Sequence, residues 1–197
     1  MIKRIEKLEE KVKEIQKEIS ELKKKIRKAP AIGEVIEIAG IEWRILDKIT
    51  DGYLAITEDF TNDSTEFDSK SNNWANSDLR AYLNTGFLKK IEEEIGNDSL
   101  VTFERELLSL DGQTEYGTCV DKVSLLSVDE YRKYRKYLPN MNKWWWLISP
   151  WSTKCNGYES QVTVVSPSGY ICSDVCSDGY GVRPFCILKS NIFESEE

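Results

Sequence analysis

The segment from Ser152 to Tyr180 carries the residue types of this chain that are best suited to molecular recognition. Ser, Gly, Tyr, Cys, Asn and Asp make up 18 of its 29 residues. Tyrosine offers a rigid amphipathic ring that loses little rotamer entropy on contact, and the small polar residues form adaptable hydrogen bonds. The composition of this segment therefore indicates a binding surface.

The spacing within this segment predicts a β-hairpin. Ser166-Pro167-Ser168-Gly169 has proline at the second turn position and glycine at the fourth, between two strand-like runs, Gln161–Val165 and Tyr170–Tyr180. Alternate residues of an extended strand share a face, so one row of the second run is expected to point outward. That row consists of Tyr170, Cys172, Asp174, Cys176, Asp178 and Tyr180. An ordinary edge strand with no binding role is the alternative interpretation.

The chain contains no histidine, which removes the commonest general base, the usual metal ligand and the Ser-His and Cys-His nucleophile pairs. Its five cysteines are an odd number and do not indicate a disulfide framework. Cys119 and Cys186 are expected to be small buried residues. Cys172 and Cys176, spaced C-x3-C, could form a zinc site with Cys155, but closed structural sites usually use paired cysteines or histidines. We therefore expect no metal and no cofactor.

Composition and charge limit the number of domains and the kinds of partner that this chain can have. The chain has 197 residues, a formal net charge of -7 and six tryptophans, which suit one domain of ordinary size with an appendage. An acidic balance without a broad basic patch predicts no nucleic-acid partner. No apolar run approaches the roughly 20 residues of a membrane span, and the N-terminus lacks the apolar core of a signal peptide. We expect no membrane span, and export by the usual secretory route is not indicated.

Residues 1–29 predict an oligomerisation helix, because apolar residues recur with the 3-4 spacing of a coiled coil. One core position holds Ile5, Val12, Ile19 and Ile26, and the other holds Met1, Leu8, Ile15 and Leu22. In a parallel pair Arg4 would face Glu9 and Glu18 would face Lys23. Core residue types favour a dimer at some positions and a trimer at others, so both a parallel homodimer and a homotrimer remain open. A lone amphipathic helix packed on its own domain is the alternative.

Pro30 ends this helix, and residues 30–197 are expected to form a second domain of the α+β class. Short strands are predicted at Val35–Ile38, Ile41–Leu46 and Tyr53–Thr57. Helices are predicted at Asp78–Leu83, capped by Asn76 or Ser77, at Leu88–Ile95, and at Val128–Tyr137, capped by Ser127. Strands followed by helices and then strands, without βαβ alternation, indicate an α+β fold.

Four motifs occur in order along this domain. They are Trp74 to Asn84 (WANSDLRAYLN), Asp121 to Ser127 (DKVSLLS), Trp145 to Pro150 (WWLISP) and Gly181 to Pro184 (GVRP). Together they resemble an uncharacterised domain of bacterial and prophage proteins that includes variable proteins of diversity-generating retroelements. The resemblance covers about residues 32–190. It implies a C-type-lectin-like fold related to formylglycine-generating enzymes.

In that family a retroelement copies a template repeat into the 3′ end of the gene while it mutates adenines, so the encoded surface varies. The resemblance implies a variable region at about residues 152–181. The implied ligand-binding residues are Cys155, Asn156, Gly157, Tyr158, Tyr170, Cys172, Asp174, Cys176, Asp178 and Tyr180. By the same resemblance Arg183 belongs to the scaffold, as an ion pair or a clamp on the backbone.

The chain also departs from its relatives. They commonly have arginine where this chain has Ile148, so the polar contact of that arginine must be replaced or absent. The signatures of calcium-dependent lectins are missing, and the catalytic cysteines of formylglycine-generating enzymes have no counterpart here. The resemblance therefore implies neither calcium-mediated sugar binding nor that catalysis.

These observations lead to a non-catalytic ligand- or receptor-binding protein, displayed as a coiled-coil oligomer in the manner of a phage fibre or a cell-surface adhesin. Its partner is expected to be a protein or glycan on a target surface. A cysteine-dependent redox or oxidase-like enzyme, with three cysteines close in sequence, is one alternative. A purely structural oligomeric spike is the other.

Overall fold

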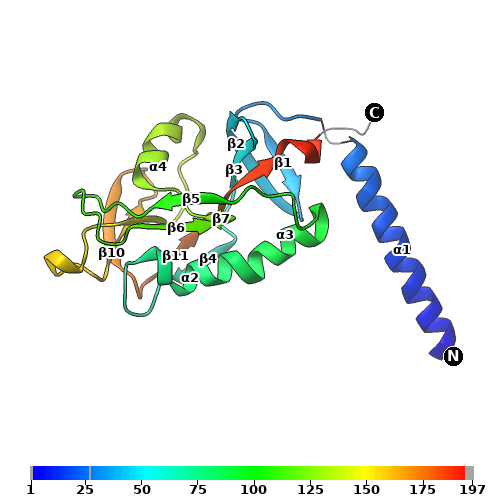
Figure 1. The fold of residues 1–197 in the computed structure, drawn as a ribbon, viewed down its shortest axis with the longest axis horizontal. Helices are drawn as coiled ribbons and strands as arrows, with labels where there is room; N and C mark the ends of the chain where they lie inside the picture. The colour runs from blue at the N-terminus through cyan, green and yellow to red at the C-terminus, as the bar shows by residue number, and fades with distance from the viewer. Residues whose placement is uncertain (1, 27, 194–197) are drawn as a thin grey trace.

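The computed structural model describes residues 2–26 and 28–193, and they form a mixed α+β structure (Figure 1). The α-helices are α1 (Ile2–Ile26), α2 (Asp78–Tyr82), α3 (Leu88–Ile95) and α4 (Val128–Tyr134). The strands are β1 (Val35–Ile38), β2 (Ile41–Ile49), β3 (Gly52–Thr57), β4 (Asn62–Glu66), β5 (Phe103–Glu106), β6 (Thr118–Asp121), β7 (Val123–Ser124), β8 (Trp145–Pro150), β9 (Gln161–Val165), β10 (Ile171–Val175), β11 (Gly179–Val182) and β12 (Phe185–Lys189). Short 3-10 or π turns are η1 (Trp74–Asn76), η2 (Leu83–Phe87), η3 (Arg135–Tyr137), η4 (Lys154–Asn156) and η5 (Ser190–Phe193).

The strands form two five-stranded sheets and a separate β5-β6 pair. The first sheet has the order β1-β2-β3-β12-β7 and is antiparallel throughout. The second has the order β10-β9-β8-β11-β4, in which β11 runs parallel to β8, with Gly181 opposite Trp145. The last strands of the chain thus divide between the two sheets and join them.

Local signals in the sequence are confirmed in the first sheet and the helices. β1, β2 and β3 form the predicted antiparallel meander, although β2 continues past its predicted end with a bulge between Ile45 and Asp47. The side chain of Ser77 caps α2. Ser127 and Glu130 form a capping box at the start of α4, where each side chain satisfies a backbone N–H of the other.

The hairpin is confirmed, but the long second strand is not. The N–H of Gly169 donates to the carbonyl of Ser166 at 2.9 Å, and Gly169 has φ +87°, which glycine adopts without strain. β10 then ends at Val175 and the chain turns before β11 begins. The prediction of one extended run from 170 to 180 is wrong. β9 and β8 lie between β10 and β11 in the sheet, so the chain must turn away from the edge strand β10 before it enters the sheet again as β11.

Two apolar clusters lie on opposite faces of β8. Trp146 packs with Phe67 and Trp74 in the larger cluster, whereas its neighbour Trp145 packs on Tyr131 in the smaller one. Consecutive strand residues point to opposite faces, so the paired tryptophans of the WWLISP motif anchor both clusters.

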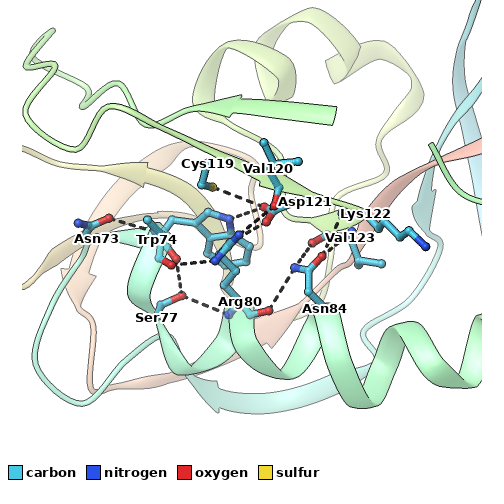
Figure 2. A network of polar contacts seen from close by, with 11 residues as sticks. Asn73, Trp74, Ser77, Arg80, Asn84, Cys119, Val120, Asp121, Lys122 and Val123 are labelled. Carbon is cyan, nitrogen blue, oxygen red and sulfur yellow. Dashed lines mark hydrogen bonds and ion pairs between the residues drawn. The ribbon is translucent and has the colours of Figure 1, made fainter. Parts of the chain in front are cut away.

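The first two motifs of the domain meet in a buried polar network (Figure 2). The carboxylate of Asp121 accepts a hydrogen bond from Nε1 of Trp74 at 2.8 Å and one from Nε of Arg80 at 2.6 Å. The Asn84 side chain donates to the carbonyl of Val123 and accepts from its N–H. These contacts fix α2 and η2 against β6 and β7, which gives the two motifs a scaffold role.

Arg183 clamps the backbone of another segment, as the resemblance implied. It is fully buried. Its guanidinium donates to the carbonyl of Thr57 at 3.0 and 2.8 Å and to that of Glu58 at 3.0 Å, and it lies 5.2 Å from the ring centroid of Trp145. Burial lowers the pKa of Arg183 to about 10, so the group stays charged at neutral pH.

Helix α1 extends away from the domain (Figure 1), and within the described part of the chain its main contacts are with α3 and η5. Its apolar residues Ile5, Leu8, Val12 and Ile15 are all more than half exposed. The alternative of a helix packed along its own domain is therefore wrong for these four residues. Of the other predicted core positions, Met1 and the side chains of Ile19, Leu22 and Ile26 lie outside the described residues. Throughout the described part of the chain, every helix is too short or too polar to cross a membrane.

Candidate functional site

The predicted binding residues form two groups, one along β10 and one beyond its C-terminal end. Tyr170 immediately precedes this strand, and with Cys172, Asp174 and Tyr180 it belongs to what we call the sheet cluster. The η4 loop, residues 152–160, lies beyond the other end, where the N–H of Cys176 donates to the carbonyl of Ser160 at 2.7 Å. Asp178 is exposed in the turn between β10 and β11.

Cys176 is not part of the surface. Its side chain is 1% exposed and belongs to the larger apolar cluster. The strand alternation that predicted an outward side chain ends at Val175, because the chain turns there. In that turn the carbonyl of Cys176 accepts hydrogen bonds from the N–H groups of Phe67 and Asp68, so this residue joins the turn to the core.

The sheet cluster is an aromatic patch built around Trp144, which directly precedes β8. The rings of Trp144 and Tyr170 meet edge to face at 5.4 Å and 90°, a favoured geometry for aromatic pairs. Tyr180 packs on Trp146 at 4.8 Å and lies 6.5 Å from Trp144. Tyr170 is 55% exposed, whereas Tyr180 and Cys172 are half-buried, so the patch is exposed mainly at its Tyr170 side.

Asp174 supplies the charge of the sheet cluster. Its carboxylate accepts a hydrogen bond from the phenol of Tyr180. This bond lowers the pKa of Asp174, and burial together with the neighbouring carboxylate raises the pKa of Tyr180. At neutral pH the pair is therefore an ionised acid held by a neutral phenol.

Asn72, a fully buried residue that precedes η1, holds the backbone of the η4 loop from its buried side. Its side-chain amide donates to the carbonyls of Ser152, Tyr158 and Gln161, each at 2.8 Å. Its own oxygen accepts from the phenol of Tyr116 at 2.7 Å. The loop backbone is thus fixed by residues far away in the sequence.

Most side chains of the loop face solvent, whereas Ser152 and Thr153 are buried. Residues 154–159 are all exposed, and Tyr158 is 51% exposed. Gly157 has φ +74°, a left-handed conformation that ends the η4 turn. Side chains on this loop contribute little to the core, so they are free to serve recognition.

The cysteines are all free thiols, and the environment of several disfavours the thiolate. The carboxylate of Glu115 beside Cys155 raises the pKa of that exposed thiol, and burial raises the pKa of Cys119, Cys176 and Cys186. A reactive cysteine needs the opposite, an electropositive setting that lowers its pKa. Cys186 is buried as predicted and Cys119 is partly buried. Among the residues placed by the structure, no cluster of three or more His, Cys, Asp or Glu could hold a metal ion.

Sequence reasoning missed four residues of this region: Asn72, Asp111, Trp144 and Trp151. Trp144 had a signal, because it precedes two tryptophans whose side chains must point to opposite faces of a strand. Asn72 and Asp111 had none, because their partners lie about 40 to 90 residues away along the chain.

A family model described as a domain of unknown function (DUF6273) matches residues 43–190 of this chain. The matched range begins within β2 and includes the rest of both sheets except β1, the sheet cluster, the η4 loop and all four motifs, and it excludes α1. No curated protein and no solved structure gives a significant match.

Proposed function

The chain belongs to the DUF6273 family, and we propose that its α+β domain is a non-catalytic ligand-binding module with a C-type-lectin-like fold. In this proposal the surface formed by about residues 152–181 binds a protein or glycan on a target surface. A retroelement diversifies that surface, as the resemblance of the four motifs implies. Helix α1 displays several copies of the module together.

One observation carries the binding part of the proposal: residues 154–159 of the η4 loop are exposed, while the loop backbone is held from outside the loop. The three carbonyls bound by Asn72 are backbone groups, so their hydrogen bonds do not depend on which side chains the loop carries. A surface of this kind tolerates change without loss of the fold, which a diversified binding site requires.

The sheet cluster fits the same role only in part. Tyr170 is exposed at the rim and is free to vary, whereas Tyr180 packs on Trp146 inside the domain. We therefore assign ligand contact to Cys155, Asn156, Gly157, Tyr158, Tyr170 and the exposed Asp178, with Cys172, Asp174 and Tyr180 forming the half-buried floor. Cys176 is assigned to the scaffold.

Oligomerisation through α1 is part of the proposal. Four apolar side chains on the heptad core positions are exposed in the single chain, and one or two further copies in a parallel dimer or trimer would bury them. Several modules held together raise the avidity of a weak contact by roughly a hundredfold or more without a new contact. A phage fibre or a cell-surface adhesin would use such an arrangement.

The thiol environments support a non-catalytic role over the redox alternative. Carboxylate contact and burial raise the pKa of the cysteines named above, which suits packing and surface contact rather than nucleophilic attack.

The DNA around the gene tests the proposal. We expect a downstream near-repeat of the segment that encodes residues 152–184, differing from it where the template has adenine. The differences should fall on codons of the exposed residues, among them those for Asn156, Tyr158 and Tyr170, and should spare the codons for Cys176 and Arg183. If no repeat is found and the codons are uniform across a population, the domain is fixed, and the proposal that a retroelement diversifies it is wrong.

A further inference from the structure

A cleft lies beside the η4 loop and is separate from the sheet cluster. It is lined by Leu110, Asp111, Trp151, Ser152, Asn156 and Tyr158. Its two walls come from distant parts of the chain, which the hydrogen bond from the N–H of Leu110 to the carbonyl of Pro150, 2.9 Å long, holds together. The cleft therefore has a defined shape in the absence of any ligand.

Two large aromatic rings line this cleft and remain open to solvent. Trp151 is 37% exposed and Tyr158 is 51% exposed. The backbone of Trp151 is fixed by the carbonyl of Gln161 at 2.9 Å, and that of Tyr158 by Thr153 and Asn72. Neither the indole N–H nor the phenol has a hydrogen-bond partner among residues 2–26 and 28–193, so both can bond a ligand.

The same cleft is lined by a preorganised polar group. The carboxylate of Asp111 accepts hydrogen bonds from Ser109, from Oγ of Ser152 at 2.7 Å and from Nδ2 of Asn156 at 3.0 Å. The hydrogen bonds from Ser109 and Ser152 lower the pKa of Asp111, so the group is charged at neutral pH. The Nδ2 of Asn156 also donates to Oγ of Ser152 at 3.1 Å. The Oδ1 of Asn156 has no hydrogen-bond partner within the described part of the chain.

We propose that this cleft binds a neutral pyranose unit of a glycan. A pyranose has an apolar face of C–H groups, which suits an aromatic ring, and a rim of hydroxyl groups, which suits a fixed carboxylate and amide. The ionised Asp111 disfavours an acidic sugar through like-charge repulsion. This inference rests on the proposed function and names the ligand class at the η4 loop end of the surface.

The experiment is saturation-transfer difference NMR on the full chain with neutral methyl glycosides of glucose, galactose, mannose and N-acetylglucosamine, and with glucuronate as the acidic probe. We expect at least one neutral sugar to receive saturation and glucuronate to receive little. In a 15N-labelled sample that sugar should shift the indole N–H signal of Trp151, which a Trp151→Phe variant identifies.

Two substitutions in the cleft should each weaken binding of that sugar at least tenfold: Tyr158→Ala, which removes a ring, and Asn156→Ala, which removes an amide on the exposed loop. Tyr82→Ala is the matched control, because Tyr82 on α2 is 53% exposed and lies outside the cleft. Asp111→Asn keeps the shape of the side chain and should weaken the preference for neutral over acidic sugars.

The inference is overturned if no neutral sugar binds, or if Tyr158→Ala and Asn156→Ala bind it as tightly as Tyr82→Ala does. Either result with a template repeat present in the DNA would leave the proposed function standing, with a ligand other than a neutral sugar in this cleft. Sugar binding at the cleft without any repeat in the DNA would support this inference and would contradict the proposal that a retroelement diversifies the surface.

Discussion

The phenol of Tyr180 on β11 donates a hydrogen bond to the carboxylate of Asp174 on β10, although β9 and β8 lie between these strands in the sheet. The bond closes the turn that carries the chain from the edge of the sheet to its interior. Because Tyr180 also packs on Trp146, the pair links the half-buried floor of the binding surface to the core. It therefore ties the C-terminal end of β10 to β11 and to the core.

Tyr180→Phe keeps the ring and removes only this hydrogen bond. We expect it to lower the free energy of unfolding by about 1 kcal/mol at neutral pH. The pKa of Asp174 is lowered in the folded state, so its contribution is present above the ordinary carboxyl pKa and is lost as the pH falls through the lowered value. The difference between the variant and the wild type should therefore shrink in strong acid, as urea unfolding at neutral and acidic pH will show. Tyr170→Phe is the control, and an equal loss in both variants would contradict the role of the pair.

Asp121→Ala removes the centre of the network in Figure 2. Its side chain is fully buried and pairs with Arg80, so we expect a loss of about 3–4 kcal/mol in the free energy of unfolding, because a partly buried guanidinium and the Trp74 N–H lose their acceptor. Lys143→Ala, which breaks an exposed ion pair with Asp63, should cost less than about 1 kcal/mol. Similar losses from the two changes, measured by urea unfolding, would show that the motif network is not structural.

Asn72→Ala should release the η4 loop. The carbonyl of Ser152 loses its donor, whereas those of Tyr158 and Gln161 each keep one backbone N–H, and we expect a loss of about 2 kcal/mol because an unsatisfied buried acceptor is costly. Limited proteolysis should then cut within residues 152–160, where the wild type resists. Asn73→Ala, which removes the cap of η1, should cost about 1 kcal/mol and leave the loop resistant. Equal cleavage of the two variants would mean that Asn72 does not hold the loop.

Leu8→Lys combined with Ile15→Lys should dissociate the oligomer. Both side chains lie at heptad core positions and are exposed in the single chain, and a charge there cannot be buried between helices. Light scattering coupled to size-exclusion chromatography should give a dimer or trimer for the wild type and a monomer for the variant. Lys13→Ala, on the outer side of the helix, should change nothing. A monomeric wild type would remove the coiled coil from the proposal.

Local chemistry explains what could be predicted. The turn at Pro167 and Gly169 follows from residues within the turn itself. The caps of α2 and α4 likewise depend on a serine and the three residues after it. The expected exposure is found where it depends on a loop, as for Tyr158, and is wrong for Cys176, whose burial depends on where β11 joins the sheet.

By itself the sequence determined the α+β class, the early meander, the helix caps, the hairpin and the apolar stripe of α1, because each depends on interactions within a few residues. Only the tertiary structure decided the parallel pairing of β8 and β11, the burial of Cys176 and the cleft between Asp111 and Tyr158. The hydrogen bond from Asn72 to Tyr158 joins residues 86 positions apart. Contacts between residues so far apart depend on the packing of the whole domain, which cannot be predicted from a local pattern of residues.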